Sequence, residues 1–153
     1  MSATEWNQQM ETRHSAIDEQ HREMFSVYAD ALEGARGGDA PAAQAAVLKL
    51  LELTRRHFAF EEQLMSESSY SHREVHAKAH AVFMRDLLDL VAHVGRDASS
   101  PVVRLWLESR YVTWWKLHVR SNDAALANYL ATLAVPPPTE PRVDPGALEK
   151  VPA

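Results

Sequence analysis

Two pairs of metal-binding residue types occur at a spacing of four along the sequence. His76 precedes His80 by four positions, and His57 precedes Glu61 by four. Four residues turn an α-helix through one turn and about 40° more, so the members of each pair share a face if these segments are helical. The apolar Phe83 continues the face of His80 at helical spacing. We therefore expect both pairs to point into the protein interior.

Two further histidines lie on apolar stripes elsewhere in the chain. His21 follows Ile17 by four residues, and His118 follows Trp114 by four. Burying so many imidazole and carboxylate groups without partners would be costly. A bound metal ion removes that cost, because neutral imidazole and carboxylate are good ligands for iron. The candidate metal ligands so far are His21, His57, Glu61, His76, His80 and His118.

Asp123 is a seventh candidate, five residues beyond His118. Five residues turn a regular α-helix through 500°, which leaves the two side chains about 140° apart. A regular helix would not direct both side chains at one metal. The spacing therefore predicts a π-type bulge or a break between His118 and Asp123.

Glycine, proline and helix-capping residues divide the chain into four long segments, and these segments must position the ligands. Residues 15–34, 39–67, 71–95 and 100–133 each have an apolar stripe at helical spacing, and sustained period-two alternation is absent, so strands are not predicted. Ser15 with Asp18, and Ser71 with Glu74, have the spacing of capping boxes, and Ser100 before Pro101 is a typical helix start.

Four amphipathic helices with short connections favour an all-α fold, an antiparallel up-down four-helix bundle. The predicted bundle domain is 1–134, and an N-terminal arm containing Trp6 lies across the helices. Residues 135–153 hold six of the eight prolines and form a predicted Pro-rich extended tail, which could bind a protein partner.

Composition excludes several classes of protein. The 153 residues include no cysteine, so disulfide scaffolds, thiolate metal sites and cysteine nucleophiles are excluded. A net charge of −5 argues against a nucleic-acid or anionic-membrane partner. The sequence has neither a secretory signal nor a membrane-spanning run, so we expect a cytoplasmic protein and, by default, a monomer.

Each site motif taken alone has a simpler explanation. A single buried histidine is more often a hydrogen-bonded core residue than a ligand, and His57 with Glu61 could be an ordinary helix-surface pair. Five inward histidines with two carboxylates on four helices are hard to explain by packing. We interpret the other histidines, His14, His72 and His93, as solvated.

The sequence resembles the hemerythrin family, and within it the single-domain bacterial members. The matching segments are IDEQH at 17–21, HFAFEEQLM at 57–65, Tyr70, the run from His76 through His80 to Phe83, and WWKLHVRSND at 114–123. Together they extend over most of the predicted bundle. The resemblance implies a four-helix bundle around two non-haem iron ions, joined by an oxo or hydroxo bridge, that bind dioxygen reversibly.

The resemblance also implies a role for each ligand. One iron would be held by His76, His80 and His118, and the other by His21 and His57, with Glu61 and Asp123 bridging the pair. Five nitrogens, four carboxylate oxygens and one bridging oxygen leave a single position open on the iron with two histidines. Dioxygen would bind there. Apolar walls would be supplied by Met24, Phe58, Trp114, Trp115 and Val119, although the family usually has leucine where Trp115 stands.

Four other functions compete with reversible dioxygen binding. A ferritin-like oxidase or ferroxidase uses Glu-x-x-His on two helices, and this chain has that spacing only from Glu11 to His14, in the arm. Catalytic reduction of peroxide, nitric oxide or dioxygen remains open, as does a role as a dioxygen- or redox-sensing module. A zinc protease is disfavoured, because Ala77 follows His76 where a general-base glutamate is required.

Overall fold

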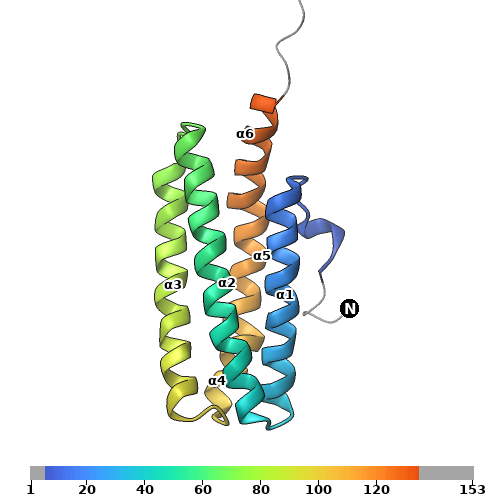
Figure 1. Cartoon of the computed structure of the whole chain (residues 1–153), viewed down its shortest axis with the longest axis vertical. Helices are drawn as coiled ribbons and strands as arrows, with labels where there is room; N and C mark the ends of the chain where they lie inside the picture. The colour runs from blue at the N-terminus through green and yellow to red at the C-terminus, as the bar shows by residue number, and fades with distance from the viewer. Residues whose placement is uncertain (1–5, 135–153) are drawn as a thin grey trace, which may run out of the picture.

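The computed structural model describes residues 6–134, and within them the fold is an all-α, antiparallel four-helix bundle (Figure 1). A short 3₁₀ turn, η1 (Gln8–Met10), lies in an N-terminal arm beside α1 (Figure 1). The first three legs of the bundle are single helices. They are α1 (Ser15–Arg36), α2 (Ala40–Glu67) and α3 (Arg73–Arg96). This confirms the predicted fold class; the predicted tail at 135–153 lies outside the described residues.

The fourth leg is a continuous helical rod with two π-helical turns. Its segments are α4 (Pro101–Leu105), η2 (Trp106–Tyr111), α5 (Val112–His118), η3 (Val119–Asp123) and α6 (Ala124–Ala134). The turn η3 lies where the ligand spacing predicted an irregularity. The turn η2 was not predicted from the sequence.

Local sequence determines where most helices begin. Asp39 caps α2, accepting a hydrogen bond from the backbone of Ala42, and Ser100 caps α4 in the same way, ahead of Pro101. Gly34 ends the inward face of α1 and lets α2 approach closely, since a Cβ at Gly34 would lie 2.8 Å from the backbone nitrogen of Ala43. The connection between α1 and α2 is therefore short and tight.

The two predicted capping boxes are wrong. His14, not Ser15, is the N-cap of α1, and its Nδ1 accepts from the backbone of Ile17 at 3.3 Å. Asp18 instead turns back to the arm. Its carboxylate accepts from the backbone and hydroxyl of Thr12, both at 2.8 Å, and from the backbone of Arg13, whose φ is +69°. His72 occupies the N-cap of α3 without a side-chain hydrogen bond, so Ser71 and Glu74 form no box there.

The apolar core divides into two clusters. The larger fills the bundle around Phe25, Tyr28, Leu87 and Trp115, and the smaller contains Ile17, Met65, Tyr70 and Leu126. On every leg the predicted metal ligands fall between residues of the two clusters or beside them in the sequence. Among residues 6–134, no helix is long and apolar enough to cross a membrane.

Candidate metal centre

The seven predicted ligands converge inside the bundle, and none exposes more than 5% of its surface. α1 supplies one, α2 two, α3 two and the fourth leg two. The donor atoms form two groups, each with all of its atoms within 4.8 Å of one another. One group contains Glu61, His76, His80, His118 and Asp123; the other contains His21, His57, Glu61 and Asp123. The two carboxylates are common to both groups.

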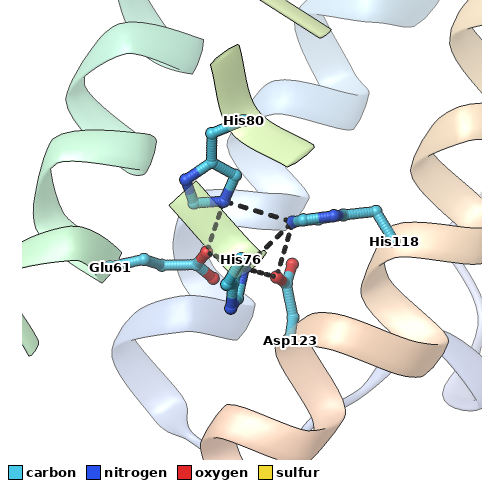
Figure 2. Close-up of side chains that lie close together, drawn as sticks. All are labelled: Glu61, His76, His80, His118 and Asp123. Atoms are coloured by element: carbon cyan, nitrogen blue, oxygen red, sulfur yellow. Dashed lines mark hydrogen bonds and ion pairs between the residues drawn. The ribbon is translucent and has the colours of Figure 1, made fainter. Parts of the chain in front are cut away.

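The group with three histidines is drawn in Figure 2, where the three imidazoles and the two carboxylates point toward one another. His76 Nε2 lies 3.0 Å from Asp123 Oδ1 and 3.2 Å from Glu61 Oε2. His80 Nε2 is 3.1 Å from Glu61 Oε2, and His118 Nε2 is 2.9 Å from Asp123 Oδ1. One carboxylate oxygen of each acid therefore faces this group.

The second carboxylate oxygens face the other group. His21 Nε2 lies 3.0 Å from Asp123 Oδ2, and His57 Nε2 lies 3.2 Å from Glu61 Oε1. Each acid thus places one oxygen toward three imidazoles and the other toward two. This is the arrangement expected of carboxylates that bridge two cations.

Protons alone cannot satisfy the close contacts among these imidazoles and carboxylates, whereas metal ions can. Nitrogen faces nitrogen at 3.0 Å between His21 and His57, and at 3.1 Å between His76 and His118. Such a pair can share at most one proton. Imidazole nitrogens lie 3.0–3.2 Å from both oxygens of Glu61 and from Oδ2 of Asp123, yet none of these contacts among the described residues has hydrogen-bond geometry, so these buried oxygens lack a hydrogen-bond donor. A surplus of buried acceptors directed at two points is what two cations would satisfy.

Electrostatics keep both acids ionised. Burial and the nearby Asp123 raise the pKa of Glu61, but the imidazoles of His57 and His76 outweigh them and hold it well below its ordinary value. Burial likewise opposes ionisation of Asp123, yet His118, His21 and His76 hold its pKa far below the usual range. The site therefore holds two buried carboxylate charges, which favour the binding of cations.

The imidazoles of α3 respond in opposite directions. Burial disfavours the cation of His76, but the close carboxylates of Asp123 and Glu61 prevail and raise its pKa to about 9. Burial lowers the pKa of His80, despite its contact with Glu61. Without metal, His76 is therefore protonated at neutral pH and partly offsets the carboxylate charge.

The turn η3 brings His118 and Asp123 to the same site. Val119–Asp123 is π-helical, and the backbone on either side keeps helical dihedral angles. The wider turn accommodates one additional residue, so side chains five positions apart nevertheless meet. This confirms the irregularity predicted from the ligand spacing.

Aromatic rings surround the imidazoles differently in the two halves of the site. In the three-histidine half, Phe58 stacks on His80 with ring centroids 3.9 Å apart, and Trp114 stacks on His118 at 4.3 Å. In the two-histidine half, Trp115 meets His21 edge to face at 5.2 Å. Trp115 is completely buried and also lies 5.8 Å from the ring of His57.

The remaining predicted wall residues lie nearby. Met24, Phe58 and Val119 are buried, whereas Trp114 is half-buried between Phe83 and His118. Their part in a gas pocket stays a prediction. Trp6 of the arm, which the sequence placed across the bundle, packs 5.8 Å from the ring of His21.

Sequence reasoning missed one polar residue beside the site, Gln20, and the role of His14 away from it. Gln20 Oε1 lies 2.7 Å from His57 Nδ1, and its position next to His21 was the available signal. His14, interpreted as solvated, is half-buried and caps α1. His72 and His93 are exposed, as expected. Glu11 is paired on the surface with Arg22 at 3.3 Å and does not reach the cluster.

Comparison with known proteins identifies the family. Residues 12–130 match the family described as the hemerythrin HHE cation-binding domain, so the chain belongs to the hemerythrin family. This family binds a di-iron centre, and the buried cluster of histidines and carboxylates is consistent with such a site.

Curated relatives come from bacteria and animals. A bacteriohemerythrin of Pseudomonas paraeruginosa is 30% identical over 122 residues, which cover 78% of this chain and 76% of the relative. One from Stenotrophomonas maltophilia is 29% identical over 131 residues, 84% of this chain and 82% of its own. A myohemerythrin of Theromyzon tessulatum is 28% identical over 119 residues, 78% and 87% of the two chains.

Proposed function

We propose that this protein binds dioxygen reversibly at its di-iron centre and serves as a carrier or store of the gas. The observation that supports this is the unequal division of the donors: three imidazoles face one group, two face the other, and both share Glu61 and Asp123. In this proposal His76, His80 and His118 hold one iron, and His21 and His57 hold the other. The second iron then has one protein ligand fewer, and the gas binds there.

The irons, when bound, supply the electrons that reduce dioxygen and take them back on its release. The protein's part is to hold the irons and to keep water away from them. Trp115 and Met24 are buried beside the two-histidine half, Val119 is buried in the core, and none of them offers an acid to protonate a bound ligand. An apolar wall slows the loss of reduced oxygen to solvent, so it favours reversible binding over turnover.

The donor set also argues against a ferritin-like oxidase. The cluster holds five imidazoles and two carboxylates, whereas ferritin-like sites are rich in carboxylates and use Glu-x-x-His from two helices. The sole candidate for that motif, Glu11 with His14, lies in the arm and is occupied with Arg22 and the cap of α1. We therefore propose binding rather than catalysis as the function.

Metal analysis combined with optical spectroscopy tests the proposal. We expect two irons per chain, and a visible absorption band that appears when air is admitted to the reduced protein and disappears when oxygen is withdrawn. Steady oxygen consumption or release of hydrogen peroxide would indicate catalysis instead. Purified protein without paired iron would contradict the proposal altogether.

A further inference from the structure

One metal ligand is fixed from outside the cluster by a side chain of a neighbouring helix. His57 lies on α2, and its Nδ1 is 2.7 Å from Oε1 of Gln20 on α1. An amide oxygen accepts hydrogen bonds and does not donate them, so this contact requires the proton of the neutral imidazole to be on Nδ1. The Nε2 lone pair of His57 is then free to face Glu61 and the metal.

The other buried imidazoles lack such a contact. Nδ1 of His21, His76 and His80 has no hydrogen-bond partner within residues 6–134. His80 Nδ1 does lie 3.5 Å from a carboxylate oxygen of Glu62, but without hydrogen-bond geometry. The contact from Gln20 to His57 is therefore not repeated at these three ligands.

Gln20 also connects the two ligands of that half. It immediately precedes His21 on α1, and its side chain reaches His57 on α2. A movement of α1 against α2 would therefore change the position of His21 and the orientation of His57 together. Metal-binding histidines commonly need such a partner to fix tautomer and ring orientation.

We propose that Gln20 is a positioning residue for the two-histidine half: it holds His57 with the proton on Nδ1 and thereby directs Nε2 at the iron that binds the gas. The effect on iron rests on the proposed function. The tautomer does not, since it is a property of the metal-free chain.

A small cavity beside this contact determines which variants can test the proposal. It has a volume of about 30 Å³ and lies between α1 and α2, with room for a water molecule. Its walls are Gln20, Glu23, Met24, Leu53, Arg56 and His57. Shortening Gln20 to alanine would enlarge it and let water accept from His57. Leucine has nearly the volume of glutamine and no acceptor, so Gln20→Leu is the stricter variant.

The first experiment uses the metal-free protein. Nitrogen-15 NMR of the imidazoles, at mildly alkaline pH, distinguishes the two neutral tautomers of His57. We expect the Nδ1–H form in the wild type and in Gln20→Glu, and loss of that preference in Gln20→Leu. A wild-type His57 with its proton on Nε2 would mean that the amide nitrogen faces the ring, and would overturn the proposal.

The second experiment measures iron binding by chelator competition. Gln20→Leu should weaken one of the two irons about 10- to 100-fold and leave the other nearly unchanged. Gln20→Glu should restore that affinity and lower the midpoint potential, because a carboxylate makes the imidazole a stronger donor. The matched control is Gln63→Leu, since Gln63 is an exposed glutamine of α2 that bonds only Glu67 within the described residues.

The outcomes separate positioning from a merely structural role. Equal weakening of both irons, or a fall in the melting temperature of the metal-free chain without a selective loss of iron, would overturn the proposal. Absence of paired iron from the wild type would instead contradict the proposed function and leave the tautomer measurement to decide the role of Gln20.

Discussion

His118 Nε2 and Asp123 Oδ1 are 2.9 Å apart although the two residues are five positions apart on one helical rod. A regular α-helix would direct these side chains about 140° apart. The π-helical turn η3 removes that divergence. The place of Asp123 in both donor groups therefore depends on the number of residues in this turn as much as on its carboxylate.

Changing the length of η3 tests that dependence. Deleting the exposed Ser121 leaves His118 and Asp123 four apart, a spacing that a plain α-helix places on one face, and we expect iron binding to survive. Inserting an alanine after Ser121 makes the separation six and turns the carboxylate away, so we expect loss of the iron pair. Iron analysis of the purified variants checks both. Equal retention by the two variants would contradict the role assigned to η3.

Removing one histidine of the three-histidine half should empty part of the site. His118→Ala is expected to reduce bound iron from two toward one per chain, because the imidazole has no substitute in its place. The exposed His93 provides the control, and His93→Ala should keep both irons. Full iron content in His118→Ala would refute the ligand assignment.

Trp115 is the residue of the expected gas pocket with the clearest test. Trp115→Leu should change the rates of dioxygen binding and autoxidation, because it opens space beside His21 and His57, at a stability cost of up to about 3 kcal/mol. Stopped-flow absorption measures the rates. Trp106→Leu, a truncation in the core among Phe83 and Tyr111, is the control for loss of packing alone. If Trp115→Leu has wild-type rates, Trp115 does not line the pocket.

The close approach at Gly34 predicts a stability effect remote from the metal. Gly34→Ala places a Cβ 2.8 Å from the backbone nitrogen of Ala43, and backbone cannot move aside cheaply, so we expect about 1–3 kcal/mol of destabilisation. Gly95→Ala meets nothing within 4 Å, and should be neutral or stabilising by up to about 1 kcal/mol. Urea denaturation of the two variants measures the difference. Equal stabilities would show that α1 and α2 can separate there at little cost.

The raised pKa of His76 predicts that iron uptake depends on pH. In the metal-free chain this imidazole has a pKa of about 9, so at neutral pH it must lose its proton before it can bind metal. Apparent iron(II) affinity should therefore rise up to about tenfold per pH unit from neutrality toward pH 9, and then level off as far as this group is concerned. Anaerobic titration with a pH indicator should detect the released proton. Affinity that stays constant over this range would contradict the assignment of His76 as a protonated ligand.

The sequence predicted the bundle and the ligand cluster because both depend on helical periodicity. His76 with His80 and His57 with Glu61 share faces in any helix, whatever surrounds them. Even η3 was predictable, because the five-residue spacing to Asp123 is incompatible with a regular helix. The turn η2 bears no such pair of ligands to reveal it.

Features that depend on a choice between partners were not predictable. Asp18 has the spacing of a capping residue, but its carboxylate gains three hydrogen bonds from the arm and takes those instead. Gln20 looks like an ordinary surface glutamine until α2 is placed beside it. The side chains of Asp18 and Gln20 are both positioned by a contact with another segment of the chain, and local spacing does not encode such contacts.

The two donor groups share Glu61 and Asp123 and draw side chains from all four legs, so bound iron would connect the legs of the bundle. The seven side chains come together only in the folded chain, so iron binds the folded state preferentially. Each iron taken up therefore raises the free energy of unfolding. The melting temperature then reports how much iron the protein holds. Preparations only partly loaded with iron should melt in distinct steps. A chelator added to cells or lysates would thereby act on the lifetime of the protein as well as on its colour.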